Sequence, residues 1–196
     1  MIPSAHQAVA LGLLRIAPPD ALFPGRDGGP AMPALADVRG ALSDIPLREL
    51  ILEGLATSLI DNFPTAEVFV GLARAGVPWA AMLADRMRRP AAVVNLDGPR
   101  ASGLQRRIEG VVAHRRVVLV DNLISSGKSL RKAGDIVTDA GGAVVGALTV
   151  ITDAVIATSA APLEFAVQSL WSLRELAEAA FDIGRIDGET HRRLVQ

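Results

Sequence analysis

Residues 117–129 read VVLVDNLISSGKS, and this stretch decides the fold. Its first four residues are aliphatic, which is typical of a strand buried on both faces of a parallel sheet. Hydroxyl residues, a glycine and a lysine follow, and the next residues predict a helix over 129–140 that ends at a glycine pair. A strand, a small-residue loop and a helix in this order indicate an α/β fold, whose ligands bind beyond the carboxyl ends of the strands.

The flanking sequence continues the alternation of strands and helices. The pattern therefore predicts a mainly parallel central sheet flanked by helices. We expect a single domain over 1–196, with an α/β core at 46–152 and a small hood formed by 1–45 and 153–196. The expected strands are 66–71, 91–96, 116–121 and 143–152, with an extended piece at 34–39 and an edge strand at 163–168; the expected helices are 5–16, 46–62, 77–88, 129–140 and 172–181, the last capped by Ser172.

Composition excludes several classes of protein. Twenty basic residues against 21 acidic ones give a formal charge of −1, so no global positive field favours a nucleic-acid partner. The chain has no cysteine, which removes disulfides, thiolate metal sites and cysteine nucleophiles. No apolar run approaches the roughly 20 residues that span a bilayer, and the first residues do not resemble a signal peptide. We therefore expect a soluble cytoplasmic protein with no membrane partner.

The loop after the strand suits a sugar phosphate. Backbone N–H groups at a helix start favour an anion, and the small residues 125–129 would let a phosphate approach them. Asp121 at the strand end suits ribose hydroxyls. Two alternatives remain: a nucleotide P-loop, which requires glycine where the chain has Asn122, and a purely structural loop in which Ser125 and Ser126 cap the helix. The three histidines lack metal-ligand spacing, so we predict no metal ligand among the side chains.

The string 117–129 resembles the signature of type I phosphoribosyltransferases. Three further segments resemble the orotate branch of that family: 36–39 (ADVR), 71–78 (GLARAGVP) and 107–110 (RIEG). The resemblance implies transfer of ribose 5-phosphate from phosphoribosyl pyrophosphate (PRPP) to a nucleobase, orotate, in pyrimidine nucleotide synthesis. It also implies Mg²⁺ bound mainly through the donor, and a cytoplasmic homodimer.

The resemblance also implies roles for individual residues. Asp121, Asn122 and Arg100 would be catalytic, with Arg100 in the place of the family's catalytic lysine. The phosphate of the ribose would be held by Ser125, Ser126, Gly127, Lys128 and Ser129, and the pyrophosphate by Ala73, Arg74, Ala75 and Gly76. From its residues alone, the turn at Gly76 is equally compatible with an ordinary helix start.

Four positions depart from the family pattern. Asn122 replaces a second acidic residue, Arg100 a lysine, Ala75 another lysine, and Ala154 the arginine that meets the orotate carboxylate. Asn122 and Ala154, together with Asp97 in the loop after the expected strand 91–96, favour a second hypothesis, a non-catalytic regulatory protein that binds PRPP or a nucleotide in a degenerate site. We also expect residues 97–110 to form a mobile loop, because they contain Gly and Pro and few apolar anchors; the sequence does not tell whether this loop closes over the ligand.

Overall fold

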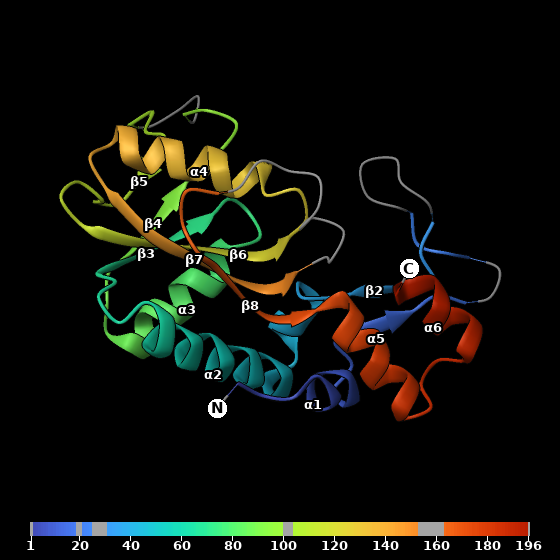
Figure 1. Cartoon of the computed structure of the whole chain (residues 1–196). Helices are drawn as coiled ribbons and strands as arrows, with labels where there is room; N and C mark the ends of the chain where they lie inside the picture. The colour runs from blue at the N-terminus through green and yellow to red at the C-terminus, as the bar shows by residue number, and fades with distance from the viewer. Residues whose placement is uncertain (1, 19–20, 25–30, 100–103, 153–162, 196) are drawn as a thin grey trace.

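The central feature of the chain is a six-stranded sheet, seen in a computed structural model that describes residues 2–18, 21–24, 31–99, 104–152 and 163–195 (Figure 1). The strand order is β5-β4-β3-β6-β7-β8. All neighbouring strands pair in parallel except β5, which runs antiparallel to β4 at one edge. The predicted α/β class with a mainly parallel sheet is therefore confirmed. The strands are β3 (Val68–Leu72), β4 (Ala91–Val94), β5 (Ile108–Glu109), β6 (Arg116–Ile124), β7 (Ala143–Thr152) and β8 (Val167–Ser172).

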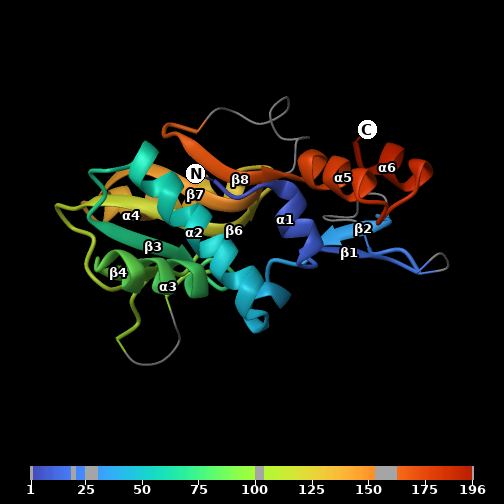
Figure 2. The same ribbon diagram turned by 90° about the horizontal axis from the view of Figure 1, so that it is seen from below.

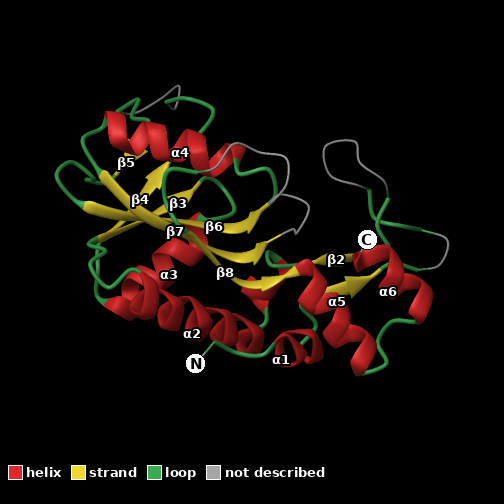
Figure 3. Ribbon diagram, in the orientation of Figure 1, coloured by secondary structure: helices red, strands yellow, loops and turns green. Residues whose placement is uncertain are grey.

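Helices cover both faces of this sheet (Figure 3). On one face, α2 (Ile45–Asn62) and α3 (Val77–Met87) pack through Ile51 and Trp79 in the same apolar cluster as Val118. On the other face, α4 (Lys128–Asp139) packs through Leu130 against a cluster that contains Leu119. The alternating side chains of β6 thus bury both faces of the strand, as its continuous apolar run predicts.

The N-terminal segment with α1, β1 and β2 and the C-terminal segment with α5 and α6 lie side by side at one end of the sheet (Figure 2). The strands β1 (Leu14–Ile16) and β2 (Ala34–Ala36) pair antiparallel, and α1 (Ala5–Ala10) contacts α5 (Leu173–Asp182). A short 3₁₀ helix, η2 (Gly40–Ser43), leads into α2, and α6 (Gly188–Val195) packs on α5. Their apolar side chains belong to the same cluster as α2 and α3. The division into core 46–152 and hood 1–45 plus 153–196 stays a prediction.

Some predicted boundaries are wrong. The helix expected over 5–16 ends at Ala10, because Gly12 adopts φ +91° and Leu14–Ile16 pairs with β2 instead. The edge strand expected at 163–168 begins only at Val167. Residues 97–115, in which no element was expected, contribute the short strand β5. β6 continues to Ile124, so part of the expected loop belongs to the strand.

Across the described part of the chain, no helix is both long enough and apolar enough to cross a membrane.

Candidate functional site

The site lies at the carboxyl ends of two neighbouring strands, β3 and β6. In the parallel register Gly71 lies opposite Val120, so the segments that follow the two strands emerge side by side. A methyl group built on Gly76 would lie 2.1 Å from the backbone oxygen of Val120 and 3.0 Å from Cα of Asp121. The turn 73–76, in which the Ala73–Arg74 peptide bond is cis, thus lies against the strand end that carries Asp121. Only glycine permits this approach.

The loop after β6 has an open helix start at its end. Gly127 adopts φ +68° and is the N-cap of α4, and among the described residues no side-chain cap is formed at this helix start. The alternative in which Ser125 and Ser126 cap the helix is therefore wrong. A small cavity of about 60 Å³ lies here, lined by residues that include the whole predicted phosphate loop: Asp121, Leu123, Ile124, Ser125, Ser126, Gly127, Lys128, Ser129 and Leu130.

The helices that begin at the site differ from the other α-helices of the described chain. Neither α3 nor α4 has a side-chain cap. The other four helix starts are capped by Ser4 for α1, Asp44 for α2, Ser172 for α5 and Asp187, whose Oδ1 accepts from Thr190 N at 2.8 Å, for α6. Unpaired N–H groups at a helix start carry partial positive charge and bind anions. The two uncapped helix starts, which follow the neighbouring strands β3 and β6, could therefore each accept an anion.

Asp121 is the titratable group of the site. Its carboxylate is partly buried, and this desolvation raises its pKa to about 6, although the N–H of Asn122, 2.8 Å from Oδ1, and the positive charge of Arg39 act in the opposite direction. Arg39 follows β2 in the chain and is a site residue that sequence reasoning missed. It is the last residue of the 36–39 segment that resembles the orotate branch, but that resemblance gave it no role.

A second feature that the sequence did not reveal is a row of polar side chains across three strands. Asp121 of β6 lies opposite Thr149 of β7, which lies opposite Ser169 of β8. The Thr149 and Ser169 hydroxyls are 2.7 Å apart, and Thr149 is fully buried. The one available signal was a threonine in the interior of the strand 143–152, whose other interior residues are apolar or glycine. Buried hydroxyls that pair with each other hold the sheet in register beside the carboxylate.

The site offers few ligands for a metal ion. Among the described residues, no three His, Cys, Asp or Glu side chains gather closely enough to hold one. One carboxylate, Asp121, and one amide, Asn122, stand at the strand end. This donor set does not form a protein cage, but it fits a Mg²⁺ ion that keeps its waters and is carried by substrate phosphates.

The structure brings most of the predicted site residues together. Asp121, Asn122 and the loop 125–129 lie next to the turn 73–76, in which Gly76 is buried and Arg74 exposed. Arg100 and Ala154 lie outside the described residues, and the loop 97–110 is described only in part. The donor side of the predicted site is thus contiguous in space.

Comparison with known proteins agrees with this geometry. The family model described as a phosphoribosyl transferase domain matches residues 38–161. The orotate phosphoribosyltransferase of Cutibacterium acnes is 37% identical over 180 residues, which cover 90% of this chain and 82% of the relative. The chain therefore belongs to the phosphoribosyltransferase family. Within that family it is similar to the orotate phosphoribosyltransferases.

Solved structures show the same fold. The orotate phosphoribosyltransferase of Aeropyrum pernix superposes with a TM-score of 0.68 at 22% identity, over 92% of this chain and 98% of that one. The Mycobacterium tuberculosis orotate phosphoribosyltransferase in complex with PRPP gives a TM-score of 0.55 at 28% identity, over 72% of this chain and 82% of that one. The predicted assignment to the type I family is confirmed.

Proposed function

We propose that this chain transfers ribose 5-phosphate from PRPP to orotate and releases pyrophosphate, a step of pyrimidine nucleotide synthesis. The observation that carries the proposal is the open start of α4 at Gly127 beside the partly buried Asp121, in a chain of the phosphoribosyltransferase family. An anion position next to a carboxylate suits one end of a sugar phosphate and its hydroxyls.

The two uncapped helix starts bind opposite ends of the donor molecule. The residues of the loop 125–129 bind the 5-phosphate through backbone N–H groups, three hydroxyls and the exposed Lys128. The turn 73–76 binds the diphosphate, because Gly76 lets the backbone approach closely and the start of α3 is free of a cap. Since the two turns follow neighbouring strands, a single donor molecule bridges them.

The reaction breaks the bond between C1 of the ribose and the diphosphate oxygen, and the electron pair leaves with the diphosphate. A base nitrogen donates the pair that forms the new bond to C1, which becomes positively charged between these events. Asp121, when ionised, stabilises that charge and binds the ribose hydroxyls. A Mg²⁺ ion carried by the donor could be met by the oxygens of Asp121 and Asn122, and it would supply positive charge that stabilises the leaving group.

The departures at four positions favour a second candidate function. Asn122 supplies no negative charge, Arg100 cannot act as an acid near neutral pH, Ala75 lacks a cation, and Ala154 leaves the orotate carboxylate without its family partner. A protein with these residues that binds PRPP or a nucleotide without turnover is a regulatory protein.

Turnover separates the two functions. We expect orotate to be consumed in the presence of PRPP and Mg²⁺, as measured by its ultraviolet absorbance, and pyrophosphate to appear in equal amount. Asp121→Asn is the matched inactive control. Tight PRPP binding by calorimetry without transfer to orotate, uracil or any purine base would assign the regulatory function, and absence of PRPP binding would contradict both.

The family resemblance extends the proposal to location and assembly. We infer that the enzyme acts in the cytoplasm as a homodimer. Light scattering coupled to gel filtration is expected to give twice the 20.5 kDa of the chain.

A further inference from the structure

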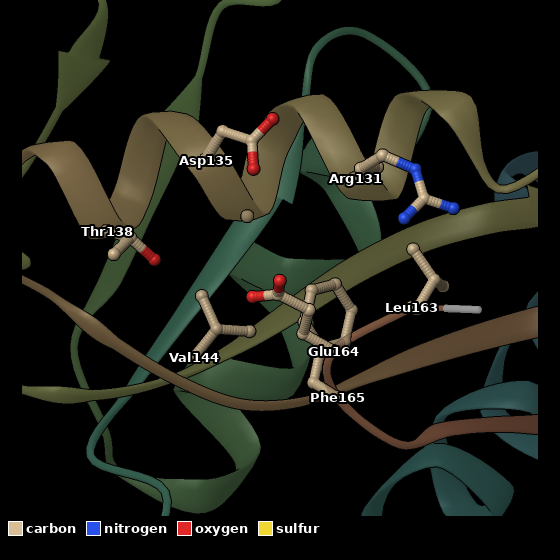
Figure 4. Close-up of a pocket in the computed structure, with 8 residues that line it drawn as sticks. Arg131, Asp135, Thr138, Val144, Leu163, Glu164 and Phe165 are labelled. Carbon is tan, nitrogen blue, oxygen red and sulfur yellow. The ribbon is translucent and has the colours of Figure 1, made fainter. Parts of the chain in front are cut away.

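A pocket of about 210 Å³ lies between α4 and residues 163–165, the segment that leads into β8 (Figure 4). It is separate from the small cavity at the loop 125–129, because the two cavities share no lining residue. The proposed transfer therefore leaves this pocket unused. Its volume is much larger than a single water molecule or a bare ion needs, so it has room for a small organic molecule.

Part of the pocket lining is apolar. Val144, Leu163 and Phe165 are half-buried and pack against the cluster that contains Leu130. Gly134 of α4 also lines the pocket and contributes no side chain. A hydrocarbon group of a bound molecule would leave water on contact with this part of the lining, which favours binding.

The rest of the lining carries charges of both signs. Arg131 and Asp135 lie one turn apart on α4, and Glu164 comes from the facing segment (Figure 4). Asp135 and Glu164 are exposed, and within the described part of the chain neither carboxylate has a hydrogen bond or an ion pair. Arg131 already has an interaction, but a guanidinium has several N–H donors and can bind a further carboxylate.

These charges restrict the chemistry of a ligand. A bare cation at the two carboxylates would also meet the positive charge of Arg131, and an anion at Arg131 would meet two negative charges. A molecule with both an ammonium and a carboxylate group avoids these repulsions, and each of its charged groups gains hydrogen bonds to a group of opposite charge. An aliphatic α-amino acid has these two groups and also an alkyl side chain that suits the apolar lining.

We propose that this pocket binds a small aliphatic α-amino acid. Asp135 and Glu164 accept hydrogen bonds from its ammonium group, and Arg131 donates to its carboxylate. Its alkyl side chain packs on Phe165 and Val144. The proposal does not depend on the proposed function, because none of these residues lines the donor site.

The first test uses the unsubstituted chain and three ligands of similar shape. Calorimetry measures the binding of L-leucine, of 3-methylbutylamine, which lacks the carboxylate, and of 4-methylpentanoate, which lacks the ammonium group. We expect L-leucine to bind at least about 10-fold more tightly than either analogue, because each analogue loses charge-assisted hydrogen bonds.

The second test assigns the ligand to the pocket. Asp135→Asn and Glu164→Gln are each expected to weaken L-leucine binding by about 10-fold, since each removes one charge that pairs with the ammonium group. Asp139→Asn is the matched control, because Asp139 is an exposed carboxylate of the same helix that does not line the pocket. The control should bind L-leucine as the original chain does.

Three results would overturn the proposal. One is the absence of binding by L-leucine, L-valine and L-alanine at concentrations up to about 10 mM. Another is binding of 3-methylbutylamine or 4-methylpentanoate as tightly as L-leucine, which would show that one charge is enough. The third is an equal affinity for L-leucine in Asp135→Asn, Glu164→Gln and Asp139→Asn, which would place the amino acid elsewhere on the protein.

Discussion

The helices that begin at the site lack the side-chain cap that the helices beginning elsewhere have at their first N–H groups. α1, α2, α5 and α6 each have a side-chain cap, and the boxes at Ser4 and Ser172 satisfy two backbone groups each. α3 and α4 have none. A cap contributes about 0.5 to 2 kcal/mol, so the two helices at the site forgo stability that the others gain. The two helix starts that lack a side-chain cap are thus the two that the proposed function assigns to the phosphate and diphosphate of the donor.

The turn that opens α3 is the place where this comparison is most sensitive to substitution. Gly76→Ala is expected to lower the free energy of unfolding by about 3 kcal/mol, because the new methyl group meets the backbone oxygen of Val120 at 2.1 Å. Urea denaturation measures the change. Gly188→Ala at the start of the capped helix α6, where the nearest atom is 3.7 Å away, should change stability by less than about 0.5 kcal/mol. Equal effects at the two glycines would contradict the close packing at the site.

The site also contains a partly buried carboxyl group, that of Asp121. Its pKa is raised from 3.8 to about 6, so the folded state binds its proton more tightly than the unfolded state. The stabilisation from the neutral carboxyl is present below about pH 4 and is lost as the pH rises through 6. In Asp121→Asn the side chain cannot ionise, so this loss of folding stability does not occur. The variant is therefore expected to be about 2 kcal/mol more stable than the original free protein at pH 8, and to have no transfer activity.

Two measurements check this expectation. Thermal unfolding of both proteins from pH 4 to pH 8 should show a gap in Tm that opens between about pH 4 and pH 6. The transfer rate of the unsubstituted chain should rise with an apparent pKa of about 6. A Tm gap that is constant with pH would contradict the raised pKa.

The smallest expected effects come from single serines. Ser172→Ala removes the capping box of α5, which does not line the cavity at 125–129, and should cost about 1 kcal/mol of stability with no change in PRPP affinity. Ser126→Ala removes a hydroxyl that caps nothing and should weaken PRPP binding with little change in stability. Denaturation and calorimetry on the two variants measure both quantities. If Ser172→Ala lost PRPP affinity and Ser126→Ala lost stability instead, the distinction between structural and functional helix starts would be wrong.

Local patterns in the sequence predicted much of this fold. The apolar spacing of 46–62 and 77–88 predicted α2 and α3 to within one residue, and the serine before an amphipathic run correctly predicted the cap of α5. The predicted helix 5–16 was right at its start and wrong at its end, because residues Leu14–Ile16 pair with Ala34–Ala36, a strand twenty residues further along the chain. Apolar spacing over so short a stretch does not reveal such a partner.

In the site, too, residues that are close together in the sequence could be predicted, and residues brought in from other strands could not. The loop 121–129 is continuous in sequence, so its chemistry was visible before the structure. Arg39 and Thr149 reach Asp121 only through the order of the strands and the turn after β2. The absence of a cap on α4 was also out of reach, because two serines before a helix are equally compatible with capping and with phosphate binding.

One measurement tests most directly whether the open start of α4 binds the donor phosphate. Ser129→Glu places a negative charge in the first turn, which now has none. The charge favours the helix by about 0.5 kcal/mol but competes with phosphate for the same N–H groups. Calorimetry should therefore show at least about a 100-fold loss of PRPP affinity in a protein of equal or higher Tm, whereas Ser129→Gln, of the same size without the charge, should lose far less. Equal PRPP affinity in the Glu and Gln variants would contradict the account.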